Sequence, residues 1–190
     1  MKQQKPTYTD DELITRMWDK EIIQNLMGRH TFLYASDARK EELEKLWVRE
    51  PENRARASLG SNWGFYAGFD EIEKYYVHKH EADRYAQLKC YCDIDSSIAY
   101  EKRNLGLGCW DAHTLSTPYI ELSDDGLSAR GMWYDNGQIT VGKPEGTPEA
   151  YFICGLIGAD FLKENGKWKI FHLMLANDHA APVGEDYSKI

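Results

Sequence analysis

The sequence predicts an α+β fold in which a cone-like, curved antiparallel sheet is closed by N-terminal helices. Two observations support this prediction. Helical spacing dominates the first half of the 190-residue chain, whereas long apolar, aromatic-rich runs with strand character fill the second half. The last two runs, residues 151–164 and 167–176, flank Asn165-Gly166, and this dipeptide is the strongest short-range signal of a β-hairpin. Helices that precede a long-stranded sheet pack against one of its faces.

Two helices are expected at the start of the chain. A capping box over residues 9–12 starts the first helix near Asp10, and an apolar stripe continues it to about Ser36. A second helix begins within residues 37–40 and is stopped by Pro51, because proline cannot continue a helix.

The middle of the chain alternates between short strands, a helix and the first long strand. Residues 55–67 are expected to form one or two short strands, and about residues 70–88 a third helix. Residues 90–104 fit either a helix or a loop. A long strand should cover residues 107–122 and end at the turn 123–126.

The rest of the predicted sheet follows this turn. A strand begins over residues 129–134, and the Gly- and Pro-rich residues 136–148 are expected to form a loop before the closing hairpin. Residues after Asp178 have little periodicity and are expected to form a tail. We therefore predict a single domain over residues 1–190, with its core at about residues 10–178.

Charge and composition exclude several classes of partner. The net charge is −8, and Lys and Arg form no cluster among the aromatics, so nucleic acid and membrane are not expected as partners. Residues 1–6 hold no apolar signal core, and no apolar run approaches membrane-spanning length, which predicts a cytoplasmic protein. The cysteines lack zinc-site or redox spacing and are expected to be reduced and buried: Cys90, Cys92, Cys109 and Cys154.

His113 is the first candidate for chemistry. A neutral imidazole can take a proton from carbon, or donate one to a leaving hydroxyl, near neutral pH. With the two-residue period of a strand, Asp111, His113, Leu115 and Thr117 share one face. The alternative is a core histidine that is hydrogen-bonded to the backbone.

A second group of candidates lies on the first helix. His30, Tyr34 and Asp37 are spaced i, i+4 and i+7, so they follow one helical face and could form a polar patch opposite His113. The alternative is a solvated stripe in which Asp37 caps the next helix.

The last strand carries a third group. Trp168, Ile170, His172 and Met174 are expected to share one face, and Asn177 follows them. An inward His172 would be a second acid–base group or a hydrogen-bond partner of the substrate, whereas an outward one would belong to the surface or to a dimer interface. Because the last hairpin is apolar on both faces, we expect a homodimer or a higher homo-oligomer.

No metal or cofactor is expected. The sequence holds no H-x-H strand pair, Walker loop or dinucleotide fingerprint. The aromatic share of 13% suits a hydrophobic pocket for a ring-shaped ligand, or simply a core of large residues. Rings that fit either reading are Trp63, Tyr66, Trp110, Trp133 and Tyr151.

The order helix–helix–strand–helix, followed by a long four-stranded sheet ending in residues 166–172 (Gly-Lys-Trp-Lys-Ile-Phe-His), resembles the SnoaL-like group of the nuclear-transport-factor-2-like superfamily. The resemblance covers about residues 21–178 and implies a cone of curved sheet closed by helices. Members of the dehydratase type are the most similar: scytalone dehydratase, bile-acid 7α-dehydratase and the lindane dehydrochlorinase.

The resemblance also implies a set of site residues. His113 falls at the position of the catalytic histidine on the first long strand of these enzymes. Their aspartate, late in the first helix, aligns with Ala35, and Asp37 lies two residues further on. His30 stands where the bile-acid enzyme has a tyrosine, and Asn177 where it has an arginine.

Together these patterns predict a cofactor-independent lyase that eliminates water, or another β leaving group, from a small hydrophobic cyclic substrate, or a related isomerase. His113 would act as base and then acid, with Tyr34 and either His30 or Asp37 polarising the substrate. Replacing His113 by alanine should then abolish turnover with little change in melting temperature. The alternatives are a non-catalytic binding protein, in which His113 would have no carboxylate or tyrosine within reach, and a sheet that serves mainly to dimerise.

Overall fold

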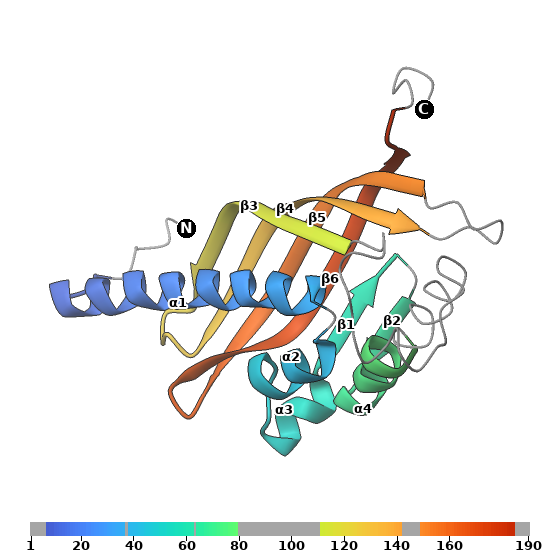
Figure 1. Ribbon diagram of the computed structural model, residues 1–190. Helices are drawn as coiled ribbons and strands as arrows, with labels where there is room; N and C mark the ends of the chain where they lie inside the picture. Colours follow the sequence, from blue (N-terminus) through green and yellow to red (C-terminus); the bar gives the residue numbers. More distant parts are fainter. Residues whose placement is uncertain (1–6, 37, 63, 80–110, 142–148, 185–190) are drawn as a thin grey trace, which may run out of the picture.

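An open, curved sheet of six strands forms one layer of the structure, and the long helix α1 lies across one of its faces (Figure 1). The computed structural model describes residues 7–36, 38–62, 64–79, 111–141 and 149–184. The strand order is β2-β1-β6-β5-β4-β3, and every neighbouring pair is antiparallel except β1 and β6. The predicted α+β fold is thereby confirmed.

In chain order the elements are α1 (Asp10–Ala35), α2 (Arg39–Leu46), α3 (Pro51–Arg56), β1 (Ser58–Ser61), β2 (Gly64–Ala67), α4 (Phe69–Glu73), the π-helix η1 (Lys74–Lys79), β3 (Asp111–Leu122), β4 (Ser128–Val141), β5 (Glu149–Glu164) and β6 (Lys167–Pro182).

Helix α1 begins where the capping box predicts. The Thr9 amide donates to the Glu12 carboxylate (2.7 Å), and the Glu12 amide donates to the Thr9 hydroxyl (3.3 Å). These two bonds satisfy backbone N–H groups that the helix leaves without partners at its start. The helix ends at Ala35, one residue before the predicted Ser36.

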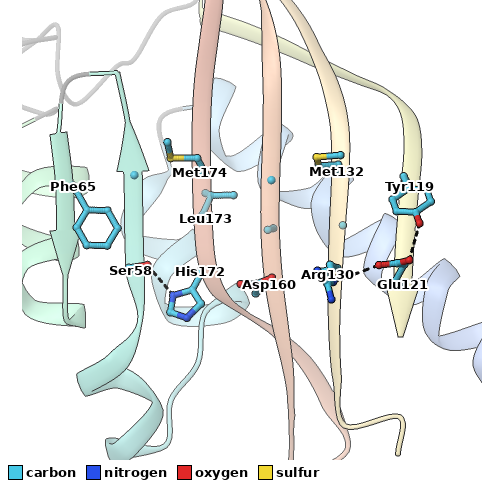
Figure 2. A pocket seen from close by; sticks show the side chains of 14 residues that line it. Ser58, Phe65, Tyr119, Glu121, Arg130, Met132, Asp160, His172, Leu173 and Met174 are labelled. Atoms are coloured by element: carbon cyan, nitrogen blue, oxygen red, sulfur yellow. Dashed lines mark hydrogen bonds and ion pairs between the residues drawn. The ribbon is translucent and has the colours of Figure 1, made fainter. Parts of the chain in front are cut away.

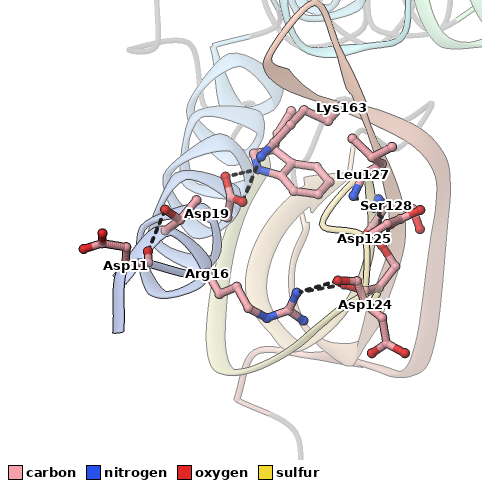
Figure 3. Close-up of polar contacts among 11 residues, drawn as sticks. Asp11, Arg16, Asp19, Asp124, Asp125, Leu127, Ser128 and Lys163 are labelled. Atoms are coloured by element: carbon pink, nitrogen blue, oxygen red, sulfur yellow. Dashed lines mark hydrogen bonds and ion pairs between the residues drawn. The ribbon is translucent and has the colours of Figure 1, made fainter. Parts of the chain in front are cut away.

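Polar contacts fix α1 to the sheet (Figure 3). Asp19 lies on the buried side of the helix and accepts from Lys163 Nζ and from the Trp168 indole, each at 2.8 Å. Arg16, one turn earlier, donates to the Leu122 carbonyl oxygen (3.1 Å) beside the β3–β4 turn.

We call the face of the sheet beneath α1 the inner face, and the opposite one the outer face. The core lies against the inner face and includes Ile23, Met27, Leu43, Trp47, Ile157, Phe161 and Leu173.

The closing hairpin turns at Asn165-Gly166 as predicted, and both residues have positive φ (49° and 75°). This is the conformation that a two-residue hairpin turn requires. Strands β4 and β6 are both longer than predicted. β6 runs to Pro182, where a tail was expected after Asp178, and β4 continues to Val141, through part of the predicted loop. Backbone pairing with β5 extends these strands despite their weak sequence periodicity.

Several other expectations are corrected by the structure or fall outside the described residues. Pro51 does more than stop a helix, because it opens α3 at a first-turn position where its missing N–H costs nothing. The predicted helix over residues 70–88 is α4 followed by η1 as far as residue 79. Cys154 is exposed, because it points to the outer face of β5. The residues outside the described ranges include 90–104, Trp110, Cys90, Cys92 and Cys109.

A β-bulge in β3 corrects the predicted face of Thr117. Residues 117 and 118 oppose the single residue Trp133, and Thr117 takes a positive φ of 52°. A bulge inserts one residue and reverses the alternation that follows it. His113 and Leu115 therefore lie on the inner face, whereas Thr117 is exposed.

A second bulge, at Phe171 in β6, has a larger consequence. Ile170 pairs with Phe161 and His172 with Asp160, so Phe171 is the extra residue. Trp168 and Ile170 are buried on the inner face, but His172 and Met174 are turned to the outer face. The prediction that these four residues share one face is wrong, because period-two counting cannot register an inserted residue.

The hairpin turn gives a prediction with an internal control. Gly166→Ala should lower the free energy of unfolding by about 1 kcal/mol, because alanine is strained at positive φ. Gly28→Ala, within α1, should raise it by about 0.5–1 kcal/mol, because a Cβ there meets no atom within 4 Å and alanine favours the helix. Urea unfolding of the two variants checks both signs, and equal shifts would contradict the assigned turn.

Candidate active site

The candidate site is built around an ion pair between neighbouring strands. Nδ1 of His113 in β3 lies 2.7 Å from Oδ2 of Asp135 in β4. Asp135 pairs with Leu115 in the sheet, which places the carboxylate diagonally beside His113 on the inner face. Both side chains are largely buried, with 11% of His113 and 2% of Asp135 exposed. Because the carboxylate accepts from Nδ1–H, the neutral imidazole carries its lone pair on Nε2.

The two Asp135 oxygens are not equivalent. Oδ2 accepts from His113, whereas the buried Oδ1 has no hydrogen-bond partner among the residues that the structure describes. A buried carboxylate held in this way depends on the imidazole to offset the cost of removing its charge from water. An imidazolium on His113 would lie directly against this carboxylate.

Tyr34, in the last turns of α1, lies edge-on to His113. The two ring centroids are 4.8 Å apart and the planes meet at 87°. On another side, the Arg39 guanidinium stacks over the Tyr34 ring at 3.6 Å. His30, one turn earlier on α1, is 5.9 Å from Tyr34, ring to ring. Of the predicted patch of His30, Tyr34 and Asp37, Tyr34 contacts the His113 ring and lies between the two histidines.

A second histidine–carboxylate pair lies deeper. His30 Nδ1 donates to Glu42 Oε1 at 2.8 Å, and the Glu42 side chain is fully buried. The Trp47 indole (3.3 Å) and the Tyr76 hydroxyl (3.0 Å to Oε2) also donate to this carboxylate. Burial and the adjacent Glu42 charge raise the pKa of Tyr76 well above its usual value, so this phenol remains a donor. Of the two histidine–carboxylate pairs, the His113 pair is the more accessible.

His172 is not brought to this cluster. It lies on the outer face, where the Ser58 hydroxyl is 2.7 Å from its Nδ1 (Figure 2). Burial lowers the pKa of His172, and the neighbouring Asp160 opposes that shift. Met174 lies beside it and is half exposed. The sequence left the facing of His172 open, and the structure places it outward.

The other predicted binding residues are scattered. Trp133 is buried in the core of the inner face. Tyr66 stacks on Tyr75 with ring centroids 3.9 Å apart. Asn177 is held through its backbone, since its carbonyl oxygen accepts from the Asn62 side chain and its N–H donates to it.

Tyr151 is near the start of β5, where its hydroxyl donates to Glu149 at 2.5 Å. Asp37 and Trp63 lie outside the described residues, and so does the side chain of Asp111.

Sequence reasoning missed both carboxylates of the site, although each left a signal. Asp135 is the next inward position after Trp133, and it would have been found by continuing the strand past residue 134. Glu42 lies on the same buried helix face as Leu43 and Leu46, where a charge is unexpected. A charged residue within an apolar stripe indicates a partner in the core.

Metal ligation has no support in the described part of the chain, where no group of three or more His, Cys, Asp and Glu side chains is placed to hold an ion. None of the helices described there is long and apolar enough to cross a membrane.

A curved sheet with a helix over one face is the arrangement that the family resemblance implies. Residues 15–174 match the SnoaL-like domain family, and the chain belongs to that family. The comparison with curated proteins found no match.

Solved structures share the fold. A hexachlorocyclohexane dehydrochlorinase from Novosphingobium barchaimii is similar with a TM-score of 0.56 and 14% identity, over 91% of this chain and 95% of that one. A candidate scytalone dehydratase from Novosphingobium aromaticivorans has a TM-score of 0.56 and 14% identity, over 92% of this chain and 99% of that one. At this identity the likeness shows the fold.

The buried network predicts that substitutions of two adjacent glutamates differ greatly in their effect on the free energy of unfolding. Glu42→Gln removes a charge that has three donors in the core and should lower the free energy of unfolding by about 2–4 kcal/mol. Glu41→Gln, which removes only an exposed ion pair with Lys45, should leave it nearly unchanged. Chemical denaturation of both variants is the test, and similar losses would show that Glu42 is not a structural centre.

Proposed function

We propose that this protein is a cofactor-independent lyase of the dehydratase type, or a related isomerase, acting on a small hydrophobic cyclic substrate. The observation that carries the proposal is the buried His113–Asp135 pair, at 2.7 Å, with Tyr34 against the imidazole. This differs from the site that the family resemblance implies. The carboxylate comes from the adjacent strand rather than from the end of the first helix.

In the proposed reaction, Nε2 of His113 removes a proton from the carbon next to a substrate carbonyl. The electron pair left on carbon enters the carbonyl as an enolate, and Asp135 stabilises the imidazolium that forms. The enolate then expels the β hydroxyl, which leaves as water with the proton from Nε2. His113 returns to its neutral state, so no cofactor is consumed. Return of the proton to a different carbon would give an isomerase.

Tyr34 is assigned to the enolate oxygen. Its phenol would donate a hydrogen bond to the substrate carbonyl, and this bond strengthens as negative charge develops there. The Arg39 guanidinium, stacked at 3.6 Å on the Tyr34 ring, places a positive charge close to that phenol. His30 and Glu42 are too buried to touch a substrate, and we assign them to positioning Tyr34.

The comparisons support the class of reaction and leave the substrate open. One structural relative is named a hexachlorocyclohexane dehydrochlorinase, and another is described as a dehydratase.

The competing function is ligand binding without turnover. A binding protein has no need of a carboxylate within hydrogen-bond reach of His113, so the Asp135 contact favours the enzyme. The cytoplasmic location and the homodimer remain predictions of the sequence.

Asp135→Asn tests the proposal most directly. Asparagine can still accept from Nδ1, but it removes the charge that stabilises the imidazolium, so kcat should fall by about 10²–10⁴-fold. The assay uses a panel of cyclic β-hydroxy ketones, followed by enone absorbance, and chlorinated cyclohexanes, followed by chloride release. Asp19→Asn, another buried carboxylate, is the control and should lower stability while kcat is kept.

Two results would contradict the proposal. One is an Asp135→Asn variant that turns over a panel substrate as fast as the unaltered protein. The other is calorimetric binding of panel compounds with no product from any of them, which would favour the binding protein.

The structure also changes what His113→Ala should do. The sequence alone suggested a nearly unchanged melting temperature, but this variant would leave Asp135 buried without its donor. We therefore expect a lower melting temperature together with lost turnover. In His113→Ala/Asp135→Ala the melting temperature should partly recover while turnover stays lost. A double variant whose melting temperature stays as low as that of His113→Ala would contradict this coupling.

A further inference from the structure

The outer face of the sheet holds a groove of about 450 Å³, on the side opposite to His113 (Figure 2). Three neighbouring strands place polar side chains in one row along this groove: Ser58 on β1, His172 on β6 and Asp160 on β5. Serine, histidine and aspartate are the members of the acyl-transfer triad, which is recognised by geometry and by the role of each residue. The row therefore contains a nucleophile, a base and a carboxylate that the inner site does not use.

The contact between Ser58 and His172 joins the nucleophile to the base. Ser58 Oγ lies 2.7 Å from His172 Nδ1, within the range over which a hydroxyl passes its proton to an imidazole. Burial lowers the pKa of His172, the charge of Asp160 opposes that shift, and the charge of Arg56 adds to it. The lowered pKa leaves the ring neutral at pH 7. In the tautomer with its proton on Nε2, Nδ1 can accept the Ser58 proton.

Asp160 is placed to stabilise the charged form of this base. Strands β1 and β5 lie on opposite sides of β6, so Asp160 flanks His172 on the side away from Ser58. When His172 takes the Ser58 proton, the imidazolium would face this carboxylate, which is the role of the aspartate in a triad. The β-bulge at Phe171 turns His172 toward this row, and bulges that re-aim a side chain are found next to active sites.

A cation and an apolar surface border the row. Arg56, at the end of α3, comes two residues before Ser58, and its charge acts on His172. A positive charge beside the nucleophile stabilises the oxyanion that forms during acyl transfer. On β6 and β4 the groove is lined by Met174 and Met132, each half exposed. Flexible methionine side chains adapt to the apolar part of a ligand.

We propose that this groove is a second active site, which hydrolyses carboxylic esters with an apolar acyl chain through an acyl-enzyme on Ser58. In the first half-reaction, Ser58 Oγ attacks the ester carbonyl carbon while its proton moves to His172 Nδ1. The negative charge that develops on the carbonyl oxygen faces Arg56. The carbonyl then re-forms, the bond from carbon to the alcohol oxygen breaks, and the alcohol leaves with the proton from His172.

Water completes the reaction in the second half. His172 Nδ1 takes a proton from the water as its oxygen attacks the acyl carbon, and the bond to Ser58 Oγ breaks. Ser58 recovers its proton from His172, and the carboxylic acid is released. Water is the only co-reactant, and neither His113 nor Asp135 takes part, so this activity is independent of the proposed lyase reaction.

A fluorophosphonate probe tests the nucleophile, because it forms a stable adduct with an activated serine that peptide mass spectrometry can locate. The unaltered protein should carry the adduct on Ser58, and Ser58→Ala should carry none. In His172→Gln, labelling of Ser58 should be about 10²–10⁴-fold slower, because the hydroxyl loses its general base. Labelling of Ser58 at an unchanged rate in His172→Gln would overturn the proposal.

Turnover is followed with p-nitrophenyl butyrate, an ester with a short apolar acyl chain. Asp160→Asn should lower kcat by about 10²–10⁴-fold, because the imidazolium loses its counter-charge. Ser116→Ala, which removes a hydroxyl from the same face of β3, is the matched control and should keep kcat unchanged. A Ser58→Ala variant that is folded by circular dichroism and hydrolyses the ester as fast as the unaltered protein would overturn the proposal.

A thiol variant keeps the test decisive if Ser58→Ala does not fold. In Ser58→Cys the introduced thiol would lie beside His172, and iodoacetamide should alkylate it about tenfold faster than Cys154, which is exposed on β5. Equal rates of alkylation at the two positions would overturn the proposal. An unaltered protein in which the fluorophosphonate labels no residue would do the same.

Discussion

The buried Glu42 carboxylate is the interaction on which the helical layer depends. It lies on α2 and accepts from His30 of α1, from Trp47 at the start of the following segment, and from Tyr76 of η1. Trp47 also pairs with Ile170, which links the same cluster to β6. A charge without solvent is stable only when donors surround it, so these segments are held in one arrangement. That arrangement sets the place of Tyr34, and through Tyr34 the surroundings of His113.

Two bulges decide which residues belong to the site and which to the surface. Without the extra residue at Phe171, His172 would point inward, toward α1. With it, the inner face holds the His113–Asp135 pair and the outer face holds His172. The bulge in β3 begins at Thr117, just beyond the site, and it reverses the alternation only of the residues that follow it.

Local signals in the sequence predicted what is local in the structure. The cap at Thr9, the turn at Asn165-Gly166 and the inward position of His113 all depend on neighbours a few residues away. Contacts between distant segments were not predictable in the same way. Glu42 meets His30 and Tyr76 only after the helices pack, and a bulge depends on the partner strand as much as on its own residues. The candidate site was therefore found at its histidines and missed at its carboxylates.

Strand β4 supports the proposed site. Its residues alternate, so that Arg130 and Met132 face outward while Trp133 and Asp135 face inward. The strand is paired on both sides along most of its length, which makes it a rigid support for Asp135. The carboxylate needs such a support, because a small displacement of either strand would lengthen its 2.7 Å contact with His113. Placing the histidine and its carboxylate on adjacent paired strands holds this distance through the backbone ladder, whereas a carboxylate at the end of a helix would depend on side-chain packing alone.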